Sequence, residues 1–218
     1  MKNWSAILLL LSFCLHQACS QNPLRFKKEV EGLVAQKKQS SQKRNPIVFT
    51  GSSSIRLWTD LEKRFADKVI VNTGFGGSHM SDLLYWADDL IISFSPSMIF
   101  IYEGDNDLAE GKSSAEILRD AANLLDLIHS KIGENTKVNF ITPKPSILRW
   151  HLRGTYEAFI VELKNWASKQ KNVSVVDIWS PMLDENGALD KTLFLDDDLH
   201  INSKGYDIWT EVIRPFVE

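Results

Sequence analysis

Three consecutive serines, Ser52–Ser54, stand between an apolar run and a helical pattern. The run at residues 47–50 (IVFT) is β-branched and aromatic, as is typical of a buried strand, and Gly51 ends it. A strand, a sharp glycine turn and a helix can hold a serine hydroxyl clear of its own backbone, where it can act as a nucleophile. The start of the helix also directs backbone N–H groups toward the turn, where they could stabilise an oxyanion. The same serines could instead be ordinary helix caps.

A second candidate pair, Asp197 and His200, lies in the run LDDDLH near the C-terminus. A carboxylate three residues before a histidine can bind one imidazole nitrogen and leave the other free to accept a serine proton. The aspartate could alternatively be a helix N-cap that binds only backbone N–H groups. The pair therefore indicates nucleophilic chemistry only in combination with a suitably placed serine.

Nucleotide and metal chemistry are less well supported. The run GFGGS at residues 74–78 resembles a dinucleotide-binding turn, but His79 stands where that turn requires its third glycine. The acidic run at residues 196–198 could bind a cation, although acidic turns usually face water. The histidines after residue 20 are His79, His129, His151 and His200. No two of them have the short spacing typical of metal ligands. We therefore expect no cofactor and no metal.

Composition predicts one globular domain. The chain has 218 residues, of which 44% are hydrophobic and 24% charged, enough for a sizeable core. Its net charge of −3 gives no electrostatic basis for binding nucleic acid. No apolar run is long enough to predict a transmembrane segment.

Residues 1–20 predict a secretory signal peptide. Lys2 gives a basic start, residues 6–15 (AILLLLSFCL) form an apolar run too short to span a bilayer, and residues 18–20 (ACS) are small enough for cleavage. We therefore expect an exported protein, in the periplasm, at the cell surface or secreted, whose mature part, residues 21–218, is a single domain.

Both cysteines, Cys14 and Cys19, fall within this signal. The mature chain is therefore expected to lack a disulfide and a catalytic thiol. Cys19 resembles the lipidated cysteine of a bacterial lipoprotein, but His16 stands where that signal has an aliphatic residue. Lipid anchoring at Cys19 and simple cleavage both remain open.

Short apolar runs alternate with amphipathic helical patterns along the mature chain. The expected strands are residues 47–50, 68–72, 97–102, 137–142 and 173–177. The expected helices are residues 24–40, a segment after Ser53, residues 81–90, a helix capped by Ser113 and Glu116 and stopped at Gly133, a helix over residues 156–166, and residues 203–216. This alternation favours a parallel sheet covered on both faces, with functional residues beyond the carboxyl ends of the strands.

Four polar turns, taken in order, resemble the motif blocks of the SGNH or GDSL-type hydrolase family over essentially the whole mature chain. The blocks are Gly51-Ser52-Ser53 with Ile55, the turn at residues 72–78, Gly104-Asp105-Asn106-Asp107, and Asp197-Asp198-Leu199-His200. The resemblance implies an α/β fold, a three-layer α/β/α sandwich around a flavodoxin-like parallel five-stranded sheet. One residue departs from it, since Ser52 stands where the namesake motif has aspartate.

The resemblance also implies the roles of the site residues. Ser53 would attack an acyl carbonyl, while His200 takes its proton and Asp197 orients the imidazole. The backbone N–H groups of Ser53 and Gly77 and the side-chain amide of Asn106 would form the oxyanion hole. Gly76 is the neighbouring alternative to Gly77, but the residue that follows favours Gly77.

The resemblance and the signal peptide together predict an exported serine esterase that removes O-acyl groups, with acetylated carbohydrate as the expected substrate. Alternatives are a small-ester or lipid acyl hydrolase, of lysophospholipase or thioesterase type, and a catalytically silent binding module. Arg149 and Trp150, after the fourth strand, could contact a sugar or an acidic group. Equally, Trp150 could pack under its loop and leave Arg149 solvated. No insertion resembles the apolar lid of a long-chain lipase.

Overall fold

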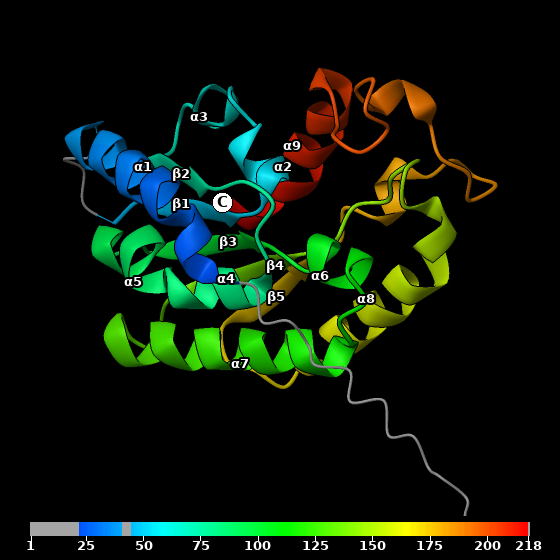
Figure 1. The fold of residues 1–218 in the computed structure, drawn as a ribbon. Helices are drawn as coiled ribbons and strands as arrows, with labels where there is room; N and C mark the ends of the chain where they lie inside the picture. Colours follow the sequence, from blue (N-terminus) through cyan, green and yellow to red (C-terminus); the bar gives the residue numbers. More distant parts are fainter. Residues whose placement is uncertain (1–21, 41–44, 218) are drawn as a thin grey trace, which may run out of the picture.

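The computed structural model of this protein describes residues 22–40 and 45–217. Five parallel strands form one sheet in the spatial order β2-β1-β3-β4-β5 (Figure 1). The strands are β1 (Ile47–Gly51), β2 (Ile70–Gly74), β3 (Met98–Tyr102), β4 (Lys137–Ile141) and β5 (Val173–Val176). This is the flavodoxin-like strand order, so the predicted fold class is confirmed.

Helices cover both faces of the sheet (Figure 1). The α-helices are α1 (Lys27–Ser40), α2 (Ser53–Arg56), α3 (Leu61–Arg64), α4 (Met80–Tyr85), α5 (Ala87–Leu90), α6 (Asp105–Ala109), α7 (Ser114–Lys131), α8 (Arg153–Ala167) and α9 (Ser203–Val217). Short 3-10 helices span Pro23–Phe26, Ile92–Phe94, Trp150–Leu152, Ser180–Met182 and Lys191–Leu193. Apolar side chains of α1, α4, α5, α7 and α8 form the core on one face, and those of α2, α3 and α9 form the core on the other.

Side chains alternate along β3 between these two cores. Ile99 and Ile101 belong to the core on the α7 side. Met98, Phe100 and Tyr102 belong to the core on the α9 side. Because both faces are covered, all five residues are buried, and the sequence shows a continuous apolar run in place of polar alternation.

The predicted ends of α7 are confirmed. The hydroxyl of Ser113 accepts a hydrogen bond from the Glu116 backbone N–H (3.3 Å), and the Glu116 carboxylate accepts one from the Ser113 N–H (2.9 Å). Gly133, with φ of +120°, follows the helix. The capping box and the glycine stop together give this helix boundaries that can be seen in the sequence.

One predicted helix is divided in two, and another is a single turn. The helix expected over residues 81–90 is divided into α4 and α5 at Trp86, whose φ and ψ of −95° and 12° are not α-helical. The Trp86 indole N–H donates to the Pro23 carbonyl (2.9 Å), so a tertiary contact holds this break. The helix after Ser53 is a single turn, because Trp58 enters the core and stacks on an aromatic ring of α9.

The predicted signal peptide, residues 1–20, and Cys19 lie outside the described residues. The signal peptide and the lipid anchor therefore stay predictions. Within residues 22–40 and 45–217, no helix has both the length and the apolar character needed to cross a bilayer.

Gly51, the last residue of β1, permits the close packing that begins the Ser52–Ser54 turn. Its φ is +117°, and a Cβ atom added to it would lie 2.1 Å from the Tyr102 carbonyl oxygen. The same oxygen accepts a hydrogen bond from the Ser52 N–H (3.0 Å). A side chain at position 51 would therefore push the serine turn away from β3.

We expect Gly51→Ala to lower the free energy of unfolding by more than about 2 kcal/mol, because it adds a strained backbone conformation to a direct overlap. Gly32→Ala is the control: position 32 is inside α1 with nothing within 4 Å of an added Cβ. That change should raise stability by roughly 0.5–1 kcal/mol. Urea unfolding of both variants, followed by tryptophan fluorescence, makes the comparison. Equal stability of the two would show that the close packing at position 51 is not required.

Candidate active site

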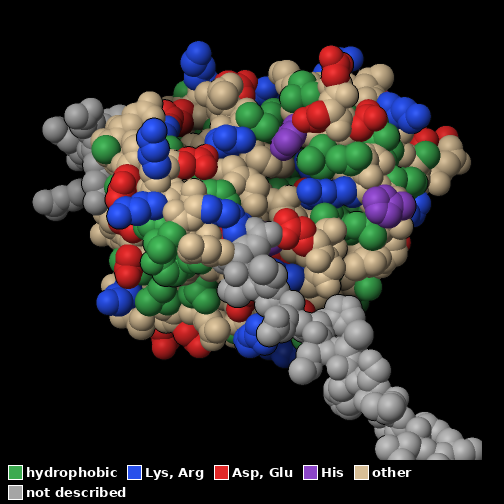
Figure 2. All heavy atoms as spheres, in the orientation of Figure 1, with side chains coloured by type: hydrophobic (Ala, Val, Ile, Leu, Met, Phe, Trp, Pro, Cys, Tyr) green, Lys and Arg blue, Asp and Glu red, His purple; other side chains and the backbone are tan. Residues whose placement is uncertain are grey.

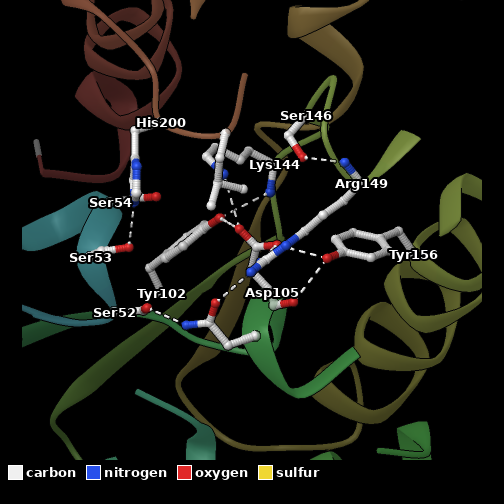
Figure 3. A network of polar contacts seen from close by, with 12 residues as sticks. Ser52, Ser53, Ser54, Tyr102, Asp105, Lys144, Ser146, Arg149, Tyr156 and His200 are labelled. Carbon is white, nitrogen blue, oxygen red and sulfur yellow. Dashed lines mark hydrogen bonds and ion pairs between the residues drawn. The ribbon is translucent and has the colours of Figure 1, made fainter. Parts of the chain in front are cut away.

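Ser53, His200 and Asp197 meet beyond the carboxyl ends of the strands. The Ser53 hydroxyl lies 2.9 Å from Nε2 of His200, although the two residues are 147 positions apart in the sequence (Figure 3). Nδ1 of the same ring lies 2.6 Å from a carboxylate oxygen of Asp197. Ser53 is the first residue of α2, and the other two lie in the loop before α9. The structure therefore brings together the three residues that the sequence singled out.

Asp197 binds both the ring and the backbone. One carboxylate oxygen contacts the His200 ring, and the other accepts N–H bonds from Leu199 (3.0 Å) and His200 (2.8 Å). Partial burial acts to raise the pKa of Asp197, but these hydrogen bonds prevail and lower it to about 2. Because an ionised carboxylate can only accept, Nδ1 of the neutral ring carries the hydrogen and Nε2 accepts from Ser53. The two roles left open by the sequence are thus compatible.

The two neighbouring aspartates, Asp196 and Asp198, are exposed. The Asp198 carbonyl accepts a hydrogen bond from the Leu148 N–H (3.0 Å), which ties the loop after β4 to the loop that carries His200. Asp198 has a φ of +57°, in the left-handed region that aspartate tolerates better than most residues. Asp197 is therefore the member of the acidic run that contacts the imidazole.

Asn106 in α6 lies next to the serine turn. Its side-chain N–H groups donate to the Ser52 hydroxyl (2.7 Å) and to the Ser78 carbonyl (2.9 Å). Gly77 directly precedes Ser78, is exposed, and has a φ of +65° with open space where a Cβ would be. The turns after β1, β2 and β3 therefore converge at Asn106, and Ser52, the departure from the family motif, contacts this amide.

A buried carboxylate that the sequence reasoning missed lies behind Asn106. Asp105 accepts hydrogen bonds from Tyr102 (2.8 Å), Tyr156 (2.7 Å), Lys144 (3.0 Å) and Arg149 (2.6 Å) (Figure 3). Burial acts to raise the pKa of Asp105, but the charges of Lys144 and Arg149 hold it well below its usual range. The available signal was Lys144, a lysine between two prolines after an apolar strand, whose side chain is 1% exposed.

Arg149 is not solvated, so this half of the alternative is wrong. Its guanidinium pairs with Asp105 and also donates to the Asn106 carbonyl oxygen (2.9 Å). Trp150 packs on Trp179, with ring centroids 6.3 Å apart and planes inclined by 14°, as the packing alternative predicted. Contact of Arg149 or Trp150 with a substrate stays a prediction.

A cavity of about 510 Å³ lies beside Trp150, between the loop after β4 and residues 186–191. Its lining is mixed: Ile147, Trp150, Arg153, Asn186, Gly187, Ala188, Leu189 and Lys191. This lining includes Trp150 but neither Ser53 nor His200. The space-filling view shows acidic and basic side chains interspersed over the face that it presents (Figure 2).

A second buried acid, Glu103, follows β3. Its carboxylate accepts a hydrogen bond from the Ser78 hydroxyl (2.6 Å), while its other oxygen has no partner among the described residues. Burial, and then the negative charge of Asp107, raise the pKa of Glu103 well above its usual value. Asp107 itself accepts hydrogen bonds from the Met80 N–H and from Lys112, so it holds the start of α4 against α6.

Residues 47–208 match the model of the GDSL-like lipase/acylhydrolase family. The structure is similar to a GDSL-like lipase from Bacteroides thetaiotaomicron, with a TM-score of 0.69, 21% identity, and 90% of this chain and 97% of that chain covered. It is similar to a lipase/acylhydrolase from Enterococcus faecalis (TM-score 0.65, 22% identity, 79% and 95%). It also resembles a carbohydrate esterase family 3 protein from Talaromyces cellulolyticus (TM-score 0.65, 17% identity, 79% and 96%). The sequence matches none of the curated proteins with which it was compared.

Because the pKa of Glu103 is raised in the folded protein, we expect this residue to make the stability of the protein depend on pH. Between the unfolded pKa of glutamate, about 4.3, and the folded value, the folded state binds more protons than the unfolded state. The contribution of Glu103 to stability is therefore present below that unfolded pKa and declines as pH rises. Glu103→Gln keeps an acceptor for Ser78 and removes this titration. The Tm of the variant minus the Tm of the wild type should therefore increase as the pH rises from 5 to 8. Thermal unfolding across that range checks this; a Tm difference independent of pH would contradict it.

Proposed function

The chain belongs to the GDSL-like lipase/acylhydrolase family, and we propose that it is an exported serine esterase that removes O-acyl groups, acetyl above all, from carbohydrates. The observation that carries the proposal is the 2.9 Å contact between the Ser53 hydroxyl and a ring nitrogen of His200, whose other nitrogen contacts Asp197. A serine, a histidine and an ionised carboxylate in this order are the elements of nucleophilic acyl transfer.

In the proposed reaction the Ser53 hydroxyl attacks the ester carbonyl as its proton passes to Nε2 of His200. Asp197 stabilises the imidazolium, which then protonates the leaving alcohol. An acyl group remains on Ser53 until water, deprotonated by the same imidazole, releases the acid and restores the hydroxyl. Every proton moves between Ser53, His200, the alcohol, water and the released acid, so no cofactor is required.

The negative charge that develops on the carbonyl oxygen would be held by the backbone N–H groups of Ser53 and Gly77 and the side-chain amide of Asn106. Donors of this kind lower the barrier because they are oriented before the charge appears. The Asn106 amide already lies beside the residue preceding Ser53, and Gly77 leaves its surroundings open for a substrate.

Two observations bear on the substrate. One solved structure with the same fold is named as a carbohydrate esterase, which supports the carbohydrate proposal. A lipid or other small apolar ester is the second candidate, because Leu148 and Leu195 are 55% and 46% exposed. Both contact the loop that carries His200: the Leu195 N–H donates to the His200 carbonyl (2.8 Å), and Leu148 donates to Asp198. A catalytically silent module would not need Ser53, His200, Asp197 and Asn106 together.

The first experiment tests the nucleophile and the substrate class. A fluorophosphonate should label wild-type protein at Ser53 alone, and Ser53→Ala should lower kcat at least about 10³-fold. Ser54→Ala is the control, because Ser54 is buried and outside the proposed reaction. Wild-type kcat/KM should be at least about tenfold higher for p-nitrophenyl acetate than for the octanoate, with acetylated oligosaccharides also hydrolysed.

Labelling of Ser52 or Ser54 would overturn the assignment of the nucleophile. A preference for octanoate would favour the lipid candidate. Unlabelled protein that binds acetylated sugars without turnover would indicate the silent module.

A second prediction distinguishes the three aspartates before His200. Asp197→Asn should lose most activity, because an amide fixes neither the ring tautomer nor the imidazolium as a carboxylate does. Asp196→Asn and Asp198→Asn should stay within about tenfold of the wild type, near 1.4 kcal/mol, since the two ring nitrogens of His200 contact Asp197 and Ser53. Parallel measurement of kcat/KM for the three variants decides the matter. Retained activity in all three would reduce the set to Ser53 and His200, with the ring oriented by backbone.

A further inference from the structure

We propose that Arg149 is a positioning residue for the oxyanion hole: it fixes the side-chain amide of Asn106 in the orientation that presents its N–H groups to the reacting oxygen. The proposal rests on the esterase function proposed above. It assigns Arg149 a role within the protein in place of the substrate contact that its sequence position suggested. The evidence is a continuous set of contacts from the buried Asp105 carboxylate through Arg149 to the Asn106 amide.

The partners of Asn106 allow only one orientation of its amide. A guanidinium can only donate, so the Asn106 atom that lies 2.9 Å from Arg149 must be the carbonyl oxygen. The Ser78 carbonyl can only accept, so the atom 2.9 Å from it must be the amide nitrogen. Without Arg149, the oxygen side of the amide would lose its donor and the Ser78 carbonyl alone would oppose a rotation by 180°, which would place an acceptor where the oxyanion requires a donor.

Arg149 is itself held by the buried carboxylate of Asp105. Two nitrogens of one guanidinium make two different contacts: one with Asp105 (2.6 Å) and one with Asn106 (2.9 Å). The planar fork of arginine suits such a double contact, whereas the single ammonium of lysine cannot reach both acceptors in the same geometry. The position of Asn106 is thereby coupled to an ion pair inside the protein.

The Asp105 carboxylate that holds Arg149 is itself held by several other side chains. Hydrogen bonds from Tyr102 and Tyr156 and the ion pair with Lys144 satisfy its carboxylate from other directions (Figure 3). Burial acts to lower the pKa of Arg149, but the ion pair with Asp105 raises it overall. Both partners are therefore charged at neutral pH. A charged donor on the amide oxygen also polarises the amide and strengthens its N–H groups as donors.

The test is a double-mutant cycle between positions 149 and 106. Arg149→Lys keeps a charge for Asp105 and should lower kcat about 10–100-fold, with KM within about threefold, because the affected contact strengthens in the transition state. Asn106→Ala should lower kcat about 10²–10³-fold. In the Asn106→Ala background, Arg149→Lys should cost less than about threefold, because its effect is transmitted through the absent amide.

Arg153→Lys is the matched control. Arg153 also makes two contacts with one guanidinium, to Glu157 (2.7 Å) and to the Gly187 carbonyl (3.0 Å), but it touches neither Asp105 nor Asn106. Its kcat should stay within about twofold of the wild type. Tyr156→Phe is a second test if Arg149→Lys unfolds. It removes the hydroxyl that contacts both the carboxylate (2.7 Å) and the backbone carbonyl (2.8 Å) of Asp105. It should lower kcat about two- to fivefold and should lose that effect in the Asn106→Ala background.

Three results would overturn the proposal. Multiplicative losses in the double variant would show that Arg149 acts independently of Asn106. A raised KM with unchanged kcat, greatest for acidic substrates, would make Arg149 a substrate contact. Wild-type kcat in folded Arg149→Lys would show that the contact has no catalytic consequence. Failure of the esterase function is distinguishable from all three, because the wild-type protein would then neither hydrolyse esters nor be labelled at Ser53.

Discussion

The last paired row of the sheet, in which Gly51 lies between Gly74 and Tyr102, fixes where the turns that carry Ser53, Gly77 and Asn106 leave the sheet. Parallel strands end at the same edge, so three turns from distant parts of the sequence leave the sheet at one level. The turn after β1 carries Ser53, the turn after β2 carries Gly77, and that after β3 carries Asn106. If one strand were shifted by one residue against its neighbours, the turn after it would move and its side chains would exchange faces of the sheet.

Asp197 and Asp105 are held in contrasting environments. Asp197 is held mainly by short local bonds, two of them from backbone N–H groups within three residues, and stays partly exposed. Asp105 is buried, and its partners come from β3, α8 and the loop after β4. A buried carboxylate would be costly alone, and full engagement by two cations and two hydroxyls is what makes its burial tolerable.

The sequence predicts those features whose causes are local. The strands, the capped α7 and the pairing of Asp197 with His200 each depend on residues within a few positions of one another, and the parallel order then brings Ser53 to them. The break at Trp86 and the network around Asp105 depend on contacts such as Trp86 with Pro23, 63 residues away. Nothing in local spacing indicates such pairs, so the sequence does not show that Lys144 and Arg149 surround a buried carboxylate.

The contact between Ser52 and Asn106 bears on how the candidate site would distinguish a neutral oxygen from a charged one. In the free protein the two N–H groups of the Asn106 amide are occupied by the Ser52 hydroxyl and the Ser78 carbonyl. In the proposed reaction, an oxyanion formed beside Ser53 would compete with the hydroxyl of Ser52 for the Asn106 amide. A neutral hydroxyl is a weaker acceptor than a charged oxygen, so the exchange is favourable only once negative charge has developed. In the proposed reaction, this exchange would therefore favour the transition state over the ground state.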